Sequence, residues 1–282
     1  MIGRIVKNIS NDYTVKVNEE KIVCKPRGVF RNKKITPLVG DIVQIENNVI
    51  QEIYPRKNEL IRPPLSNIDN AFIITSVVDP IFNSNLLDKM INIIEYNNIK
   101  PILIFTKLDL LENKEEINNI ISYYKKIGYE VYLNTELDKI KTLFKDKLTI
   151  FTGQTGVGKS TLINSLDSSL KLNTNEISKA LGRGKHTTRH TELYDLYGGL
   201  VADTPGFSSL DFIDMDIYDI RDNFIEFNDY KEKCKYKDCM HIDEDDCEVK
   251  RNLDNILFSR YENYKKFIES KKGDKYGRKK NN

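Results

Sequence analysis

The chain has 282 residues, of which 39% are hydrophobic and 30% are charged, and its formal net charge at pH 7 is +2. One domain usually takes roughly 100–200 residues, so we expect two or three domains. No apolar run approaches the roughly 20 residues of a membrane span and the first ten residues do not resemble a secretory signal, so we expect a cytoplasmic protein, not embedded in a membrane, with reduced cysteines.

The small net charge conceals two basic ends. Residues 1–65 carry +5 (12 basic, 7 acidic) and residues 260–282 carry +6 (9 basic, 3 acidic). Between them, residues 66–225 carry −5 (17 basic, 22 acidic) and residues 226–259 carry −4 (6 basic, 10 acidic). Basic ends around an acidic centre are typical of a protein that binds a polyanion, although a solvated tail explains the last segment almost as well.

The first 65 residues are predicted to form a small β-barrel. Apolar and polar residues alternate from Tyr13 to Val17, and two apolar runs flank Asn47-Asn48, which suits a hairpin because Asn tolerates positive φ. About five strands in about 60 residues favour an OB-like barrel, a fold that commonly binds RNA, although composition alone fits any small barrel. Pro63-Pro64 marks the end of this region.

Residues 66–225 are predicted to form an α/β domain with a mostly parallel sheet. Apolar strand candidates at 71–78, 101–106 and 129–133 alternate with amphipathic helical patterns. The next apolar strand runs directly into a glycine-rich loop that begins at Gly153, and a helical pattern follows that loop.

The glycine-rich loop, GQTGVGKS, matches the phosphate-loop pattern G-x-x-x-x-G-K-[ST]. Its glycines let backbone N–H groups surround phosphate oxygens at the positive end of a helix, Lys159 reaches the β and γ phosphates, and the Ser160 hydroxyl ligates Mg²⁺. A fortuitous turn is disfavoured because a strand precedes the loop and a helix follows it. The predicted nucleotide contacts are Gly153, Gln154, Thr155, Gly156, Val157, Gly158, Lys159, Ser160 and Thr161.

The sequence DTPG at 203–206 is predicted to complete the phosphate site. Asp203 follows an apolar segment, where its carboxylate holds Mg²⁺ through water, and Gly206 offers its N–H to the γ-phosphate. The motif is weak alone and convincing about 40 residues after a phosphate loop. Phe207 stands where many GTPases carry a Gln that orients the attacking water, so we expect slow intrinsic hydrolysis.

The residues Thr106, Lys107, Leu108 and Asp109 resemble the guanine-reading motif [NT]-K-x-D. The Asp109 carboxylate can accept guanine N1–H and N2–H₂ together, a donor pair that adenine lacks, so the motif selects GTP over ATP. Lys107 would cover the base with its aliphatic stem. Thr106 replaces the usual Asn, which predicts weaker guanine binding. For the tetrapeptide alone, a polar turn with Asp109 as a helix cap is the alternative.

The order of these motifs is rotated. In an ordinary GTPase the phosphate loop comes first and the guanine-reading motif last, whereas here TKLD precedes GQTGVGKS, which precedes DTPG. Placing the three earlier strands after DTPG restores the ordinary order. We therefore predict a circularly permuted P-loop GTPase domain.

Three of the four cysteines and one histidine lie close together, as Cys234, Cys239, His241 and Cys247. Such ligands in a cytosolic chain fit one closed, tetrahedral, structural Zn²⁺ site. The acidic residues at 243–246 are expected to form a solvated loop rather than ligands. Apolar residues then recur every three or four positions from Val249 to Ile268, which predicts a long packing helix.

The barrel, TKLD, GQTGVGKST, GRGKHTTRH, DTPG and the Cys/His cluster together resemble the RsgA (YjeQ) family of circularly permuted GTPases that depend on the small ribosomal subunit. The resemblance covers most of the chain. It implies an OB-like RNA-binding barrel at 1–65, a permuted GTPase domain at 66–225, and a zinc-binding domain with a C-terminal helix and basic tail at 226–282. It also implies a role in late assembly of the small ribosomal subunit, with that subunit and its rRNA as partners.

The resemblance further identifies residues 181–190 as the first switch. There Thr188 is favoured as the sensor of the γ-phosphate and Mg²⁺, with Thr187 as the alternative. His186 is the candidate for aligning the attacking water, because an imidazole orients water or accepts its proton near neutral pH. The alternative for His186 is a contact with RNA or solvent. Lys159, His186 and Thr188 form the predicted catalytic set.

We therefore expect a monomeric, Mg²⁺-dependent GTPase that docks on the small subunit with GTP, hydrolyses it, and leaves with GDP. One rival is an RNA-binding assembly scaffold in which the nucleotide is only structural. Another is a GTPase that acts on a different RNA-containing machine. The set Lys159, Ser160, Thr188 and Asp203 favours an enzyme, because a scaffold would not need a complete γ-phosphate and Mg²⁺ apparatus.

Overall fold

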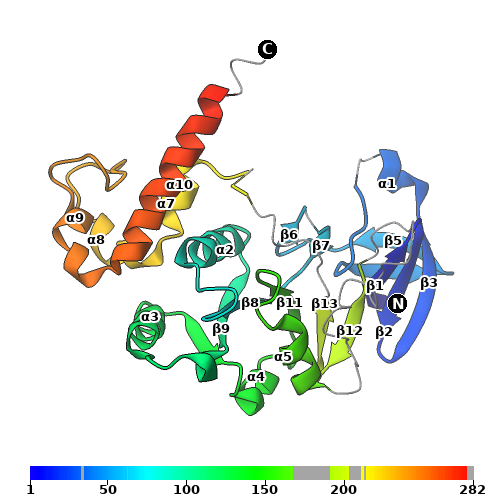
Figure 1. Ribbon diagram of the computed structural model, residues 1–282. Helices are drawn as coiled ribbons and strands as arrows, with labels where there is room; N and C mark the ends of the chain where they lie inside the picture. The colour runs from blue at the N-terminus through cyan, green and yellow to red at the C-terminus, as the bar shows by residue number, and fades with distance from the viewer. Residues whose placement is uncertain (33–34, 62, 168–190, 203–210, 213, 278–282) are drawn as a thin grey trace.

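The computed structural model describes residues 1–32, 35–61, 63–167, 191–202, 211–212 and 214–277. Figure 1 shows a β-barrel on one side, a sheet with helices in the centre, and a helical C-terminal region on the other side. Within these ranges, no helix has the length and apolarity needed to cross a bilayer.

The N-terminal strands close into a barrel in the order β1-β2-β3-β5-β4, which confirms the predicted barrel. The hairpin between β4 and β5 turns at Asn47 and Asn48, whose φ angles are 49° and 59°, as the sequence predicts. A short helix, α1 (Gly28–Asn32), lies between β3 and β4 in the chain. The strands are β1 (Ile2–Ile9), β2 (Asp12–Val17), β3 (Glu20–Pro26), β4 (Ile42–Glu46) and β5 (Val49–Ile53).

A short hairpin leads from the barrel to the central sheet. It consists of β6 (Glu59–Leu60) and β7 (Leu65–Ser66), and Pro63-Pro64 lies in the turn between them. The hairpin stays close to the barrel, because the Ser66 N–H donates to the Val39 carbonyl at 3.0 Å.

The central sheet has the strand order β10-β9-β8-β11-β13-β12. Neighbouring strands are parallel except β12, which is antiparallel to β13. The strand before the phosphate loop, β11, lies between β8 and β13 although β8, β9 and β10 precede it in the chain, as the predicted permutation requires. The strands are β8 (Asn70–Ser76), β9 (Lys100–Thr106), β10 (Glu130–Leu133), β11 (Leu148–Thr152), β12 (Leu193–Leu196) and β13 (Gly199–Ala202).

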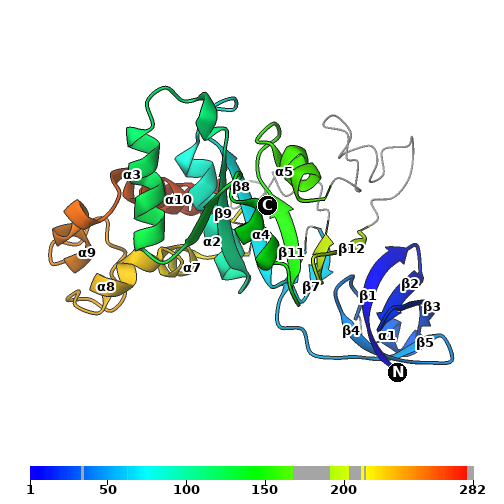
Figure 2. The ribbon, with the colours of Figure 1, turned by 90° about the horizontal axis from the view of Figure 1, so that it is seen from below.

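Helices cover both faces of this sheet, because successive side chains of a strand point to opposite faces. One alternating set packs in a cluster with α2 (Ser84–Tyr96) and α3 (Glu115–Lys126), and the other packs with α4 (Leu137–Thr142) and α5 (Lys159–Leu166). Figure 2 shows the sheet between these two helix pairs. The first set is Ala71, Ile73, Leu103, Phe105 and Ile150, and the second is Phe72, Ile74, Ile102, Ile104 and Phe151.

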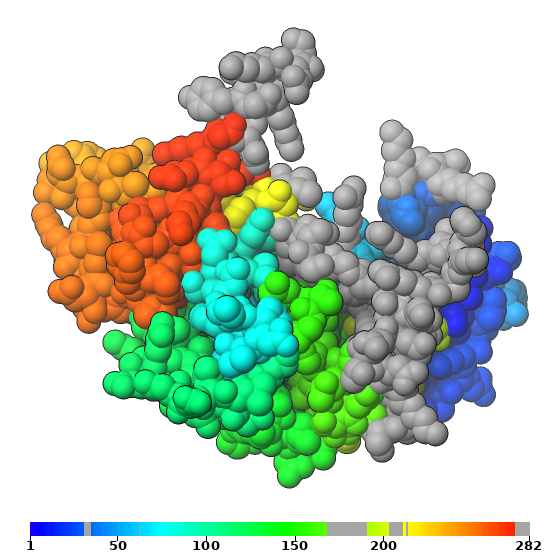
Figure 3. Space-filling view, viewed as in Figure 1, coloured from blue at the N-terminus to red at the C-terminus, as the bar shows by residue number. Residues whose placement is uncertain are grey.

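The C-terminal region packs against α2, as the space-filling view shows (Figure 3). The predicted packing helix is present as α10, but the predicted unbroken course from Val249 is wrong, because α9 ends at Arg251 and α10 begins at Phe258. Asn252 closes α9 with its side-chain amide on the Glu248 carbonyl at 2.8 Å, and Ile256 is extended. The helices are α7 (Ile217–Asp222), α8 (Asn228–Lys231), α9 (Glu248–Arg251) and α10 (Phe258–Gly277), with 3-10 turns η4 (Ile225–Phe227) and η5 (Leu253–Asn255).

Candidate functional site

The glycine-rich loop connects the carboxyl end of β11 to the first turn of α5, and its backbone requires glycine. Gly153, Gly156 and Gly158 have φ angles of 142°, 85° and 95°, in the region that side-chain-bearing residues rarely adopt. A Cβ on Gly153 would lie 2.2 Å from the Ile74 carbonyl oxygen. The loop therefore lies against β8 without room for a side chain at its first position.

Lys159 lies across this loop. Its ammonium donates to the carbonyl oxygens of Gly153 and Gln154, both at 2.7 Å. Ser160 follows it in the first turn of α5 and is half-buried, while Thr161 is exposed. A helix N-terminus that offers free N–H groups beside a lysine is suited to bind a phosphate.

The predicted guanine-reading motif, residues 106–109, lies directly against the glycine-rich loop, although Thr106 and Val157 are 51 positions apart in the chain. The Thr106 hydroxyl is buried and donates to the Val157 carbonyl at 2.6 Å, and a Thr75 carbonyl lies farther away, at 3.3 Å. A hydroxyl has one proton, so the shorter contact takes it. Thr106 therefore ties the two loops together through its hydroxyl.

Lys107 makes a second tie to the phosphate loop. It adopts a left-handed conformation with φ 63°, and its ammonium donates to the Gly156 carbonyl at 3.0 Å and to the Asp79 carbonyl. Leu108 is partly buried against the core, whereas Asp109 is exposed in the turn η1 (Leu108–Leu110). The ties made by Thr106 and Lys107 leave the Asp109 carboxylate at the surface, where it can accept from a base.

The loop after β10 also borders the candidate site, although the sequence patterns did not predict it. Leu133 pairs with Phe105 in parallel register, and the Asn134 N–H donates to the Phe105 carbonyl at 2.9 Å. Glu136 stabilises the loop by accepting from the Leu133 N–H at 2.9 Å. Because the carboxyl ends of neighbouring parallel strands meet at one sheet edge, residues 134–136 lie beside TKLD. The parallel strand pattern at 101–106 and 129–133 was the signal that could have identified them.

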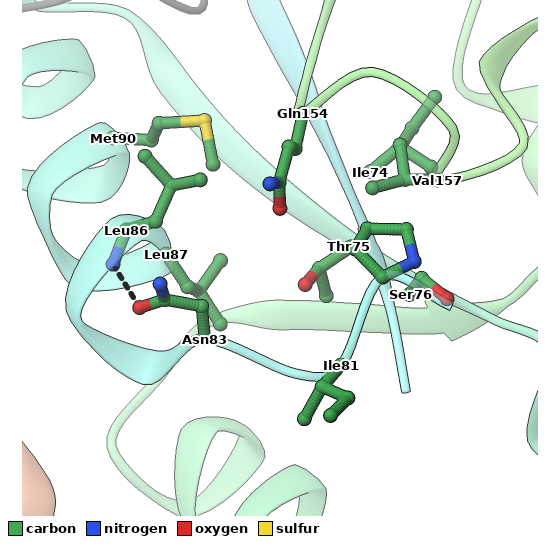
Figure 4. Close-up of a pocket in the computed structure, with 11 residues that line it drawn as sticks. Ile74, Thr75, Ser76, Ile81, Asn83, Leu86, Leu87, Met90, Gln154 and Val157 are labelled. Atoms are coloured by element: carbon green, nitrogen blue, oxygen red, sulfur yellow. Dashed lines mark hydrogen bonds between the residues drawn. The ribbon is translucent and has the colours of Figure 1, made fainter. Parts of the chain in front are cut away.

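A pocket opens between the phosphate loop, the end of β8 and the start of α2 (Figure 4). Gln154 and Val157 form one wall, and Leu87 and Met90 of α2 form the other. Asn83 caps α2 by accepting from the Leu86 N–H at 3.0 Å. The cap holds the first turn of α2 beside the phosphate loop, so α2 borders the candidate nucleotide site.

Five predicted site residues lie outside the residues that the structure describes: His186, Thr187, Thr188, Asp203 and Gly206. Their predicted roles remain predictions. Asp203 directly follows Ala202, the last residue of β13, and Ala202 pairs in parallel with Ile150 of the strand that leads into the phosphate loop.

The structure brings the predicted zinc ligands Cys234, Cys239, His241 and Cys247 together, with one ligand atom of each within 4.8 Å of the others. His241 Nδ1 lies 3.6 Å from the Cys234 sulfur and 3.4 Å from the Cys247 sulfur. Around a tetrahedral Zn²⁺, with Zn–S of about 2.3 Å and Zn–N of about 2.0–2.1 Å, such atoms are separated by roughly 3.5 Å. The four side chains therefore fit a zinc ion.

The surroundings of this cluster also suit a metal. Burial lowers the pKa of His241 to about 4, so its imidazole is neutral and can ligate through Nδ1. The Cys234 and Cys247 sulfurs accept backbone N–H groups of Glu248 and Lys250, both at 3.4 Å, which would stabilise thiolates.

The acidic loop after the histidine is not uniformly solvated. Asp243 and Asp245 are exposed, but Glu244 is half-buried. Its carboxylate accepts the backbone N–H groups of Met240 and Ile242, at 2.7 and 3.1 Å. Glu244 thus shapes the backbone on both sides of His241.

Two family models match the chain, the RsgA N-terminal domain over residues 2–53 and the RsgA GTPase over residues 53–213. Small ribosomal subunit biogenesis GTPase RsgA 2 of Oceanobacillus iheyensis is 49% identical, with 95% of this chain and 96% of that protein covered. Small ribosomal subunit biogenesis GTPase RsgA of Enterococcus faecalis is 45% identical, with 94% of each covered.

Two solved structures have a similar fold over nearly the whole chain. YloQ, described as a circularly permuted GTPase, is 39% identical with a TM-score of 0.81, covering 97% of this chain and 95% of its own. YjeQ from Thermotoga maritima is 31% identical with a TM-score of 0.85, covering 96% of this chain and 98% of its own.

Proposed function

The chain belongs to the RsgA family of circularly permuted GTPases, and we propose that it acts on the small ribosomal subunit. In this proposal the GTP form binds the subunit during late maturation, hydrolysis to GDP and phosphate follows, and the GDP form leaves. The names of its relatives support a role in biogenesis of that subunit.

One observation carries the nucleotide part of the proposal. The Thr106 hydroxyl bonds Val157 and the Lys107 ammonium bonds Gly156, so the guanine-reading motif and the phosphate loop form one surface despite their reversed order. A guanine on Asp109 and a phosphate chain on the glycine loop can thus belong to one GTP molecule. The loop at 134–136 would border the same base.

The side chains around the phosphates have separate roles. Lys159 now bonds two carbonyls of its own loop, and it would exchange them for β and γ phosphate oxygens. Ser160 and Thr188 would hold Mg²⁺, with Asp203 acting through water, and that ion would neutralise charge that develops on the phosphates. Gly206 would donate its N–H to the γ-phosphate, and His186 would orient the attacking water.

The three proposed parts of the chain would divide the work. The OB-like barrel, residues 1–65, and the zinc domain, residues 226–282, would bind rRNA, and the permuted domain, residues 66–225, would bind and hydrolyse GTP. The basic barrel end supports contacts dominated by phosphates, so binding to the subunit should weaken as salt rises. The zinc ion would fold the ligand loop and leave no open position for catalysis.

Turnover measurements test this function. GTP and ATP hydrolysis would be measured with and without purified small subunits for the wild type and for Ser160→Ala. We expect the subunits to stimulate GTP turnover of the wild type, with ATP a poor substrate, and Ser160→Ala to lose at least about tenfold of the stimulated rate.

Ser165→Ala is the matched control, because Ser165 lies in the same helix but is exposed and donates to the Thr161 carbonyl at 2.8 Å. It should keep wild-type turnover. GTP turnover that does not change when small subunits are added would refute the ribosomal assignment. Subunit binding without any hydrolysis would favour the scaffold, and stimulation by another RNA-containing particle alone would favour the second rival.

A further inference from the structure

Among the residues that the structure describes, two attachments between the barrel and the rest of the protein differ in character. One attachment is the hairpin that follows the barrel, and the other is β12, the edge strand of the central sheet. Figures 1 and 2 both show β12 beside the barrel strands. The two attachments differ in burial and in the kind of contact that holds them.

The attachment to the hairpin is buried and densely bonded. Asp41 is fully buried and accepts from the Arg56 guanidinium at 2.7 and 2.8 Å and from the Ser66 hydroxyl at 2.6 Å. A Cβ on Gly40 would lie 2.0 Å from the Ser66 carbonyl oxygen. Breaking the contact with Arg56 or with Ser66 would leave the buried Asp41 carboxylate with fewer partners. This attachment is therefore expected to persist.

The attachment to β12 contains two partly exposed ion pairs. Leu193 of β12 is buried and belongs to the same apolar cluster as Val6 of β1. Lys7 pairs with Glu192 at 2.6 Å, with side chains 32% and 27% exposed, and Lys16 pairs with Asp195 at 2.5 Å, with side chains 18% and 59% exposed. The backbones meet in one isolated antiparallel bridge, Lys7 to Glu192, rather than in a ladder. Partly exposed ion pairs of this kind each contribute about 0.2–1 kcal/mol, so the two pairs by themselves oppose opening only weakly.

Lys7 and Lys16 can also bind the phosphates of RNA. A solvated ammonium binds a carboxylate or a phosphate with similar geometry, and closely spaced RNA phosphates release counterions when lysines bind them. Glu192 and Asp195 occupy the ammonium groups of Lys7 and Lys16 in this structure. Glu19 adds one weaker contact to Lys16, at 3.9 Å.

We propose that Glu192 and Asp195 form a latch that holds the barrel on the edge of the GTPase sheet, and that RNA releases the barrel by competing for Lys7 and Lys16. The inference rests on the proposed RNA-binding role of the barrel. The barrel would turn about the buried Asp41–Arg56–Ser66 attachment. Binding RNA would thus open the contact with the edge strand and expose a basic face that is otherwise neutralised.

A disulfide measures the closed population directly. Residues opposite each other in an antiparallel bridge have Cα atoms about 4.5–5.5 Å apart, within the range of about 4.4–6.8 Å that a disulfide accepts. The Lys7→Cys/Glu192→Cys variant, loaded with zinc, would be equilibrated in a glutathione redox buffer, and its disulfide fraction would be read by mass spectrometry. Lys7→Cys alone controls for reaction with the native cysteines.

Adding Asp195→Asn to this variant removes the remaining ion pair of the latch. We expect the disulfide equilibrium constant to fall by about two- to fivefold. Asp12→Asn is the matched control, because Asp12 pairs with Lys25 at 2.6 Å inside the barrel and that pair moves with it. Equal constants for Asp195→Asn and Asp12→Asn would overturn the latch.

RNA tests the competition. A fluorescent 20-nucleotide single-stranded RNA should lower the disulfide fraction, and it should bind the reduced form at least about twofold more tightly than the oxidised form. Since the two redox states have equal charge, such a difference reports the contact rather than electrostatic repulsion. In the otherwise native chain, Asp195→Asn should bind the RNA more tightly than the equally charged Asp12→Asn.

The outcomes separate this inference from the proposed function. If the wild type binds the RNA but neither the disulfide fraction nor the affinity depends on the latch, the competition is refuted and the function stands. A wild type that binds neither the RNA nor small subunits refutes the proposed function, and the competition fails with it. The disulfide equilibrium without RNA then still decides whether Asp195 closes the barrel contact.

Discussion

Arg260 is the residue whose loss should most clearly destabilise the C-terminal region. Its guanidinium holds Glu226 with two bonds, Nε to Oε1 at 2.5 Å and Nη2 to Oε2 at 2.8 Å, and Asp88 of α2 with a third, Nη1 to Oδ1 at 2.7 Å. The three side chains are 1%, 4% and 0% exposed. Burial opposes the charge on Arg260, but Glu226 and Asp88 hold its pKa well above its ordinary value.

Arg260→Met keeps the packing volume but removes both bonds to Glu226. Asp88 keeps its bonds from the Tyr124 hydroxyl and the Asn263 amide, at 2.5 and 2.7 Å, so the larger cost comes from Glu226. Removing one partner of a buried ion pair costs about 3–5 kcal/mol. With a slope of about 2 kcal/mol per M urea, the unfolding midpoint of the C-terminal region should fall by roughly 1.5–2.5 M.

The assay is urea unfolding followed by far-UV circular dichroism, because the chain has no tryptophan. Arg251→Met is the control, since Arg251 is 58% exposed and pairs with Asp246 and Glu248 at 3.1 and 3.3 Å, and it should cost at most about 1 kcal/mol. Adding Glu226→Gln to Arg260→Met should restore part of the loss. Equal midpoints for the two arginine variants, or no recovery in the double variant, would refute the reasoning.

Four further outcomes are expected. Burial raises the pKa of Glu95 from 4.5 to about 7, so the folded protein favours the protonated carboxyl and loses stability as the pH rises from 4.5 through 7. Glu95→Gln should therefore stabilise the protein by up to about 3 kcal/mol at pH 8 and by nothing near pH 4.5, and a pH-independent gain would contradict this origin. Asp109→Asn should weaken GTP binding and improve binding of xanthosine triphosphate, whose 2-oxo group accepts from an amide; unchanged GTP affinity would exclude Asp109 from base recognition. Gly153→Ala should abolish nucleotide binding in a fluorescence titration, because its Cβ would lie 2.2 Å from the Ile74 carbonyl oxygen. Gly28→Ala should bind normally in that titration, because a Cβ there has nothing within 4 Å. Cys247→Ser should reduce the bound zinc from one ion per chain and lower the unfolding midpoint of the C-terminal region, and full zinc content in that variant would rule out the proposed ligand set.

Local rules were sufficient where one residue decides the backbone. Asn47-Asn48 turns as predicted because Asn adopts positive φ, and the glycines of GQTGVGKS have the conformations that only glycine adopts readily. Local rules failed where the apolar spacing continues although the helix does not. The apolar spacing from Val249 to Ile268 continues across the break at Asn252 because both segments face one core, so periodicity alone could not detect the break.

The first strand shows the same limit in the barrel. The register between β1 and β2 shifts between Ile5 and Lys7, so Ile5 and Val6 are both buried. A bulge of this kind removes the alternation of period two on which strand prediction depends.

By itself, the sequence determined the motifs, their rotated order and the four candidate zinc ligands, because each depends on residue type and spacing along the chain. Only the tertiary structure decided which distant groups meet: Thr106 with Val157, Arg260 with Asp88 and Glu226, and Lys7 with Glu192. These contacts join residues 34 to 185 positions apart. The packing of strands and helices determines which of these residues meet, and no local sequence pattern contains that information.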